Sequence, residues 1–182
     1  MSIATTNQYW TSRNHGDDPT ASDGEVWSAT GSGAADGDYW KITSSGYYSV
    51  TPSTSDDLTI LATVFYPNAA DIPADGTTLM LLRSDSHAVE VQSTGLATSV
   101  KIVGATASTF SDLDLTMVDI EPYITTLRLT LDASGNAKLY VHEIMEDDFG
   151  TDRSLSVTGS SDTTGRLIKW GSNDGETKWG TV

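Results

Sequence analysis

The chain has 182 residues and a mass of 19.4 kDa, a length that fits one domain. It contains no cysteine, which excludes disulfide bridges, thiolate nucleophiles and zinc ribbons. The formal net charge is −15, from 10 Lys and Arg against 25 Asp and Glu, and the cations are scattered singly along the sequence. Because nucleic-acid binding depends on clustered cations that displace phosphate counterions, neither nucleic acid nor an anionic membrane is an expected partner.

The polar residues are mainly hydroxyl-bearing, with 26 Thr and 22 Ser beside 16 Gly. This composition favours strands and turns over helices. No run approaches the roughly 18 apolar residues of a membrane span, and residues 1–10 lack the basic start and apolar run of a secretory signal. Acidity spread along the whole chain keeps a protein soluble, which fits an extracellular or particle-bound setting.

Residues 1–37 are rich in Ser, Thr, Gly and Asp and show little periodicity. We expect an irregular N-terminal arm there, followed by a folded unit over residues 38–182. Tyr9, Trp10 and Trp27 stand out, since a solvated linker has little use for large aromatic rings. They predict that part of the arm docks either on the folded unit itself or on a partner, which these three residues would then bind.

Short runs of alternating apolar and polar residues begin near residue 38 and recur at intervals of about ten residues. They predict antiparallel strands at 39–43, 47–51, 58–66, 78–83, 88–93, 99–103 and 167–171. The first two flank a Ser-Ser-Gly sequence and are expected to form a hairpin. Residues 112–123 have a helical pattern that Pro122 limits to a turn or two. The final residues, 179–182, resemble a strand, either a closing edge strand or one cut short.

The best-defined element is a hairpin over residues 124–143. Leu127, Leu129 and Leu131 alternate with polar residues, and a similar alternation marks the return strand. An Asp-Ala-Ser-Gly-Asn turn joins the two, where Gly135 can supply a positive φ. No internal repeat of about 20 to 50 residues indicates a propeller or solenoid. The expected fold is therefore all-β, an antiparallel two-sheet jelly-roll sandwich of ten or more strands with an irregular N-terminal arm.

Residues 123–143, with this turn and a Lys-Leu-Tyr-Val return strand, resemble a hairpin of the concanavalin A-like lectin/glucanase (laminin G-like) family. Residues 38–49 and 167–172 are similar to early and late strands of that family, so the resemblance covers residues 38–182. The family includes lectins, laminin G-like domains, glycanases and virion proteins of tailed bacteriophages. The cysteine-free, Ser/Thr/Gly-rich composition without a secretory signal is similar to the phage members.

The resemblance implies a non-enzymatic structural protein of a bacteriophage virion, either a capsid decoration or head-fibre subunit or a tail-associated one. Such a protein would be located in the extracellular particle and oligomeric within the assembly. It would contact other virion proteins of the capsid or tail through the arm, with binding to cell-surface glycans of the host as an added role. The alternatives are a free extracellular carbohydrate-binding module and a divergent glycanase.

No catalytic residues are apparent. An enzyme resembling glycoside hydrolase family sixteen would carry Glu-x-Asp-x-Glu on one strand, so that three carboxylates share a face. The nearest match has Met117 in place of the nucleophilic Glu, followed by Asp119 and Glu121. Because methionine cannot attack an anomeric carbon, we expect no enzyme activity. The three histidines are expected at the surface, with His87 in a turn.

A dense acidic cluster surrounds Gly150. Its carboxylates are the hard oxygen ligands that Ca²⁺ prefers, which makes Asp147, Asp148 and Asp152 the candidate metal ligands. The spacing is not that of an EF-hand, and a solvated acidic loop is the alternative. No other cofactor is expected.

Glycan binding requires an aromatic face that stacks on a sugar ring and polar groups that bond its hydroxyls. Tyr48, Trp170 and Trp179 are candidates for stacking, with Asn173 and Asp174 supplying the polar groups. Adjacent residues of a strand face opposite ways, so one ring of the Tyr-Tyr pair at residues 47 and 48 is expected to point outward. The same aromatic residues are also what the core of a large sandwich needs, and packing is therefore the alternative.

Overall fold

The computed structural model describes residues 27–31, 33–36, 39–42, 46–53, 57–66, 69–113, 115, 124–144, 153–172 and 177–180. Within these ranges the chain forms fifteen β-strands and one short 3-10 helix, η2 (Ala69–Asp71). No helix in this part of the chain has the length and apolar character that crossing a membrane requires. The prediction of an all-β protein with ten or more strands is confirmed.

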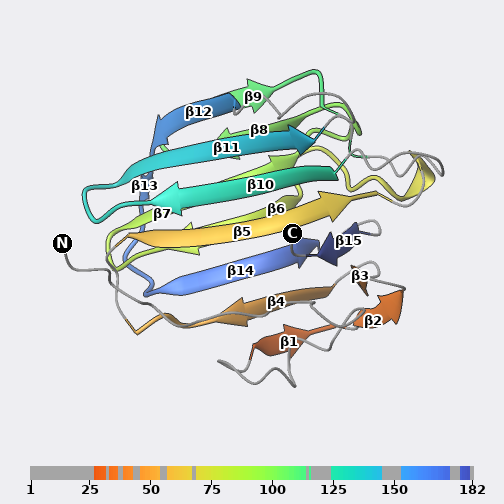
Figure 1. The fold of residues 1–182 in the computed structure, drawn as a ribbon. Coiled ribbons are helices and arrows are strands. Elements are labelled where there is room, and N and C mark those ends of the chain that lie inside the picture. The colour runs from red at the N-terminus through yellow and green to blue at the C-terminus, as the bar shows by residue number, and fades with distance from the viewer. Residues whose placement is uncertain are drawn as a thin grey trace.

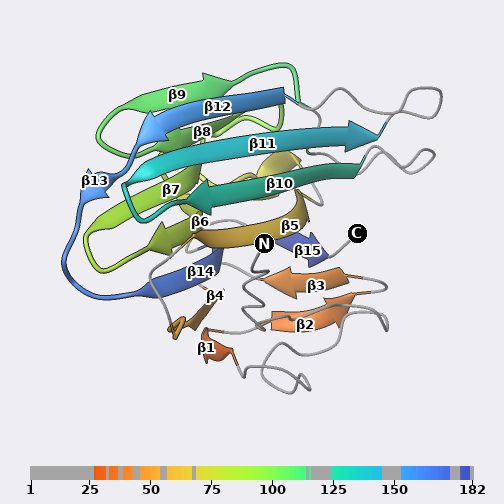
Figure 2. The ribbon, with the colours of Figure 1, turned by 60° about the vertical axis from the view of Figure 1, so that its left-hand side comes forward.

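The strands form two antiparallel sheets that pack face to face, as Figures 1 and 2 show. Sheet A contains, in spatial order, β1 (Ser28–Thr30), β4 (Gly46–Val50), β14 (Leu167–Ser172), β6 (Thr78–Arg83), β7 (His87–Ser93), β8 (Val100–Val103) and β9 (Ala107–Phe110), with β13 (Ser160–Ser161) paired to β7. Sheet B contains β12 (Arg153–Thr158), β11 (Asn136–Ile144), β10 (Ile124–Leu131), β5 (Leu58–Phe65), β15 (Thr177–Gly180), β3 (Tyr39–Ile42) and β2 (Gly33–Asp36). This two-layer arrangement is the predicted jelly-roll sandwich.

The core lies between the sheets because each strand turns one face inward. On β10, Leu127 and Leu129 are fully buried, whereas Arg128 between them is exposed. The register places Leu129 directly between Ile60 of β5 and Leu139 of β11. Burial of one such side chain contributes about 1.5–3 kcal/mol, so the alternation seen in the sequence holds the two layers together.

The β10–β11 hairpin forms as predicted, with its turn at residues 132–136. The Asp132 carboxylate accepts hydrogen bonds from the backbone N of Ser134 (2.9 Å) and of Asn136 (2.8 Å). It also accepts one from the Asn136 side-chain amide (2.7 Å), and this bond, followed by those from the backbone, holds the pKa of Asp132 below its usual value. Gly135 adopts the expected positive φ, at 85°. The turn thus fixes the register of both strands.

Strands β3 and β4 do not form the predicted hairpin, so that prediction is wrong. β3 lies in sheet B between β2 and β15, whereas β4 lies in sheet A between β1 and β14. Each strand buries a large ring on its inner face, Trp40 on β3 and Tyr48 on β4. Trp40 Nε1 donates a hydrogen bond to Tyr48 Oη across the core, so the two rings face each other from different sheets.

The last described strand, β15, lies between β5 and β3 and is not a closing edge strand, contrary to one of the two expectations for this segment. Trp179 pairs with Val64 on one side and Trp40 on the other, and it is fully buried. A central position in the sheet gives this large ring neighbours on both sides, which an edge position would not.

Residues 27–36, expected in the arm, belong to the sandwich, because β1 pairs with β4 and β2 pairs with β3. Trp27 is buried and meets Trp170 edge-on, with the ring centroids 6.0 Å apart. Trp27 therefore docks on the chain's own sandwich, the first of the two alternatives, and does not face a partner. Tyr9 and Trp10 lie outside the described residues, and their role stays a prediction.

Candidate functional site

The three aromatic rings predicted to stack on a glycan lie inside the core. Tyr48 and Trp170 are 3% exposed and Trp179 is fully buried. The Trp170 ring centroid lies 4.9 Å from that of Tyr48 and 5.3 Å from that of Trp179, so the rings contact one another in series. A sugar cannot reach them, and packing, the alternative left open by the sequence, is their role. Asn173 and Asp174 lie outside the described residues.

The alternation of strand β4 decides which ring of the Tyr-Tyr pair faces the solvent. Tyr48 lies directly opposite Trp170 in the register and shares its inward direction. Tyr47 points to the outer face of sheet A, where Lys169 Nζ lies 4.3 Å from its ring centroid. The outward ring is thus Tyr47, not the predicted Tyr48.

Most of the other predicted site residues lie outside the described part of the chain. These include the calcium candidates, Asp147, Asp148 and Asp152, which stay a prediction. His87 was expected in a turn, but it is the first residue of β7, and its ring packs against Gly135 of the β10–β11 turn. Among the described residues, no group of three or more His, Asp or Glu side chains is placed to hold a metal ion.

A hollow of about 730 Å³ opens on the outer face of sheet B, beside the β10–β11 turn. The side chains that line it include Thr59 of β5, Thr130 of β10, Lys138 and Tyr140 of β11 and Ser156 of β12. These four strands are consecutive neighbours in the sheet, so the floor of the hollow is continuous hydrogen-bonded structure. The site therefore rests on a rigid element of the fold.

The register of sheet B sorts its outward side chains into rows. One row contains Thr59, Thr130, Lys138 and Ser156, and the next contains Leu61, Arg128, Tyr140 and Ser154. Every side chain in the two rows is at least partly exposed. Since neighbouring strands are about 4.8 Å apart, each row presents side chains at that spacing across the face.

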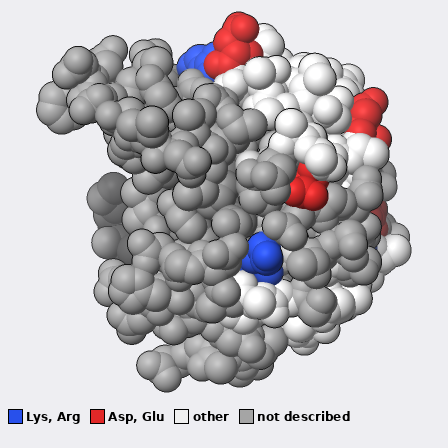
Figure 3. All heavy atoms as spheres, turned by 90° about the vertical axis from the view of Figure 1, so that its right-hand side faces the viewer, with Lys and Arg blue, Asp and Glu red and all other residues white. Residues whose placement is uncertain are grey.

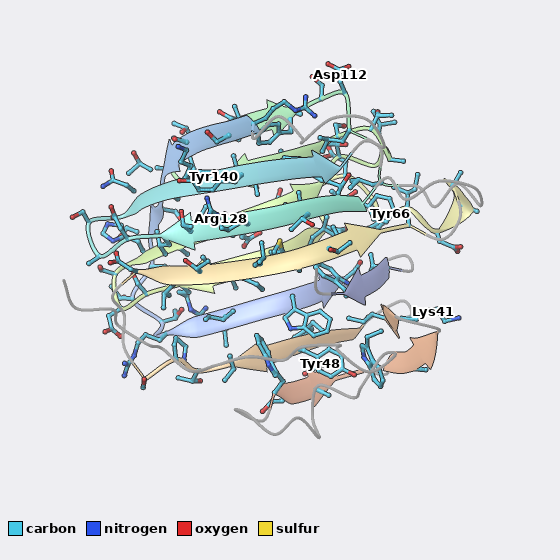
Figure 4. The ribbon with its side chains drawn as sticks, viewed as in Figure 1. Lys41, Tyr48, Tyr66, Asp112, Arg128 and Tyr140 are labelled. Carbon is cyan, nitrogen blue, oxygen red and sulfur yellow. The ribbon has the colours of Figure 1, made fainter. Side chains whose placement is uncertain are left out.

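Tyr140 is flanked by two cations on this face. The Arg128 Cζ lies 3.9 Å and the Lys138 Nζ 4.6 Å from the centroid of the Tyr140 ring. Figure 4 shows Tyr140 on β11 and Arg128 on the neighbouring β10. Arg128 is directly opposite Tyr140, and Lys138 is two residues before it on the same strand. Cations over an aromatic face are attracted by its quadrupole, so one ring orients both charges.

Two carboxylates, Asp57 and Asp132, line the turn end of the hollow. Asp132 is engaged in the turn hydrogen bonds, and its lowered pKa keeps it ionised at neutral pH. Asp57 is exposed and adopts a positive φ of 45°, which Asp tolerates better than most side chains. The hollow thus combines hydroxyl groups, an aromatic ring, the Lys138 ammonium and two carboxylates, and the lowered pKa of Asp132 keeps that group from acting as a general acid.

Sequence reasoning missed Arg128, Lys138 and Tyr140, although all three lie in the best-predicted hairpin. The available signal was the alternation itself, because the polar residues between the buried leucines must share the outer face. The sequence did not indicate which outer face would be hollowed, since the hollow also depends on residues of β5 and β12.

Comparison with known proteins relates the chain by its fold. No family model and no curated protein matches the sequence. Among solved structures, the binding domain of botulinum neurotoxin serotype G is 13% identical with a TM-score of 0.51, over 87% of this chain and 43% of that one. A mutant of HCR/D is 9% identical with a TM-score of 0.52, over 86% of this chain and 42% of that one. Arcelin-5, a lectin-like defence protein from Phaseolus vulgaris, is 12% identical with a TM-score of 0.46, over 96% of this chain and 95% of that one.

The chain spans less than half the length of the first two of these structures. At such low identity the similarity defines the fold alone. Together with the two antiparallel sheets described above, it defines this protein as an all-β jelly-roll sandwich.

Proposed function

We propose that this protein is a non-enzymatic carbohydrate-binding module, and that the glycan binds in the hollow on the outer face of sheet B. The observation that carries the proposal is the pair of exposed rows of hydroxyl-bearing, charged and aromatic side chains across four consecutive strands. The binding domain of a botulinum neurotoxin shares the jelly-roll fold, which supports a binding role.

The chemistry of the hollow suits a sugar. Hydroxyl groups of a saccharide need donors and acceptors, which Thr59, Thr130, Ser156 and the amide of Asn136 supply. The volume of about 730 Å³ falls within the range of roughly 300–1,000 Å³ that ligand sites occupy.

A binding role is favoured over glycoside hydrolysis by the state of the carboxylates. Hydrolysis needs two of them across the scissile bond, one of which must hold a proton at the working pH. Asp132 has a lowered pKa and three hydrogen bonds to the turn, which is the opposite of an acid catalyst. Met117, Asp119 and Glu121 lie outside the described residues.

The proposal is tested by filling the hollow. A glycan array identifies a ligand of the wild-type protein, and calorimetry then measures its affinity for the Ser156→Trp and Thr109→Trp variants. Both positions are exposed on edge strands, but Ser156 lines the hollow and Thr109 lies on sheet A. We expect Ser156→Trp to weaken binding at least about tenfold and Thr109→Trp to leave it unchanged. Absence of any ligand on the array, or equal affinity of Ser156→Trp and wild type, would overturn the proposal.

The virion role expected from the resemblance, with its partners and its location, stays a prediction. The structures compared above do not bear on it. A free carbohydrate-binding module, the alternative stated beside it, agrees better with the fold and the hollow.

A further inference from the structure

Two positive charges meet over one aromatic ring on the proposed binding face. Arg128 and Lys138 occupy diagonal outward positions of the β10–β11 ladder, and both contact the Tyr140 ring. The ring therefore holds the two charges together at the side of the hollow that Tyr140 and Lys138 line.

These cations differ from others in the described part of the chain. Three other cations each have a carboxylate oxygen within ion-pair distance: 3.9 Å for Arg83, 2.6 Å for Lys101 and 3.5 Å for Arg166. Neither Arg128 nor Lys138 has a described carboxylate within ion-pair distance. In a chain with 25 acidic residues and only 10 basic ones, two neighbouring cations with no described carboxylate beside them form a local exception to the charge of the molecule.

We propose that the ligand of the hollow is an acidic saccharide, whose carboxylate or sulfate group binds between Arg128 and Lys138. This inference rests on the proposed carbohydrate-binding function. The guanidinium fork of Arg128 matches two oxygens of such a group, and the Lys138 ammonium adds a point charge. The hydroxyl groups of Thr130 and Ser156, in the row of Lys138, then bond the sugar hydroxyls.

The overall negative charge of the protein affects which acidic ligands can bind at the Arg128 and Lys138 pair. At physiological ionic strength the Debye length is about 8 Å, so distant carboxylates act weakly on a group that touches Arg128. Figure 3 shows one face of the molecule, on which the described acidic and basic side chains lie scattered among uncharged ones. One acidic group on a sugar unit needs only this pair of cations, whereas nucleic acid binds along a long track of cations.

The experiment compares three polymers and four proteins. Calorimetry measures binding of polygalacturonate, dextran sulfate and neutral dextran to the wild type, Arg128→Gln/Lys138→Gln, Arg128→Lys and Lys169→Gln. Lys169 is the matched control, because it also lies over a tyrosine ring but on the outer face of sheet A. Circular dichroism and thermal unfolding verify that each variant is folded, and Arg128→Lys keeps the charge while removing the guanidinium fork.

We expect the wild type to bind one acidic polymer at least about tenfold more tightly than neutral dextran, since hydrogen bonds to a charged group are stronger than those between neutral groups. The double variant should lose that preference, Arg128→Lys should reduce it and Lys169→Gln should retain it. Whether polygalacturonate or dextran sulfate binds more tightly distinguishes carboxylate from sulfate as the recognised group.

Two results overturn the acidic ligand alone. One is that the wild type binds dextran as tightly as the acidic polymers, and the other is that the double variant keeps full affinity for an acidic polymer. In both cases a saccharide is still bound, so the proposed function stands. If the wild type binds none of the three polymers and no glycan on the array, the proposed function and this inference fail together.

Discussion

Trp40 and Tyr48 are joined by a buried hydrogen bond that links the two sheets, with Trp40 Nε1 donating to the Tyr48 hydroxyl over 2.9 Å. Their rings meet edge-on with centroids 6.2 Å apart. Gly33 of β2 leaves room for the pair, because a Cβ at Gly33 would collide with the Trp40 indole and lie 2.8 Å from the Tyr48 hydroxyl oxygen. Three strands, β2, β3 and β4, are therefore coupled through one contact.

Replacement of Tyr48 by Phe should destabilise the protein. The substitution leaves the buried Trp40 N–H without this acceptor, which costs about 1–3 kcal/mol of unfolding free energy. Urea denaturation measures the loss. Tyr47→Phe is the control, because Tyr47 points to the outer face, and it should change stability little. Equal stability of Tyr48→Phe and wild type would contradict the structural role of the bond.

Substitution of Gly135 by Ala should cost stability for two separable reasons. The residue has a φ of 85°, and an added Cβ would lie 2.6 Å from Cδ2 of His87. We expect a loss of about 1–3 kcal/mol by thermal or chemical denaturation. Gly76→Ala is the matched control, since Gly76 has a φ of 87° and nothing within 4 Å of its would-be Cβ. If Gly135→Ala is no more destabilising than Gly76→Ala, the packing of His87 on the turn contributes nothing.

Stability should fall at high pH because of Tyr66. Its hydroxyl is buried and makes no hydrogen bond of normal geometry with a described residue, and burial, opposed in part by the Ser93 side chain, raises its pKa from 10.0 to about 12. Between these values the unfolded chain releases the proton and the folded chain retains it, so the unfolding free energy decreases as pH rises. Two pKa units correspond to about 2.7 kcal/mol.

Denaturation of the wild type and of Tyr66→Phe from neutral pH to about pH 12 isolates this effect from the other tyrosines. The variant should be close to wild type in stability near neutral pH, where no hydrogen bond is lost, and relatively more stable above about pH 10. Parallel curves for the two proteins over the whole range would contradict the burial of this hydroxyl.

Asp132 should stabilise the β10–β11 turn only while it is ionised. Its pKa is lowered in the folded state, so its contribution is present above the unfolded value of about 3.9 and is lost as pH falls through the folded value. Asp132→Ala should therefore lower the thermal midpoint at pH 7, and the difference from wild type should shrink in strong acid. If the difference in thermal midpoint between Asp132→Ala and wild type did not depend on pH, the negative charge of Asp132 would not be the source of its contribution to stability.

Much of the fold follows from the sequence because alternation is a local signal. The leucines of β10 and the glycine turn specify both the strands and their pairing, as the two strands are adjacent in the chain. An alternation of apolar and polar residues does not, however, identify which strand lies next to it in the sheet when that strand is distant in sequence. For β3 and β4 the decisive contacts are with β15 and β14, more than a hundred residues away, and the expected hairpin was wrong for that reason.

The site was harder to predict than the fold. Large aromatic residues serve both cores and sugar sites, and composition does not say which side of a strand faces inward. Tyr48 and Trp170 pair across β4 and β14, so only the assembled sheet shows that both rings are inside. Gly-Ala-Ala-Asp of β2 carries no alternation of large and polar side chains, and its place in the sheet depends on the Trp40 indole packing over Gly33.

Over residues 127–131 of β10 and 137–141 of β11, buried side chains alternate with side chains on the outer face. Arg128 or Tyr140 can thus be exchanged while the leucines beside them remain untouched. The ligand preference of the proposed site would therefore be open to change one outward position at a time, without the loss of folding that usually restricts the evolution or engineering of a buried pocket.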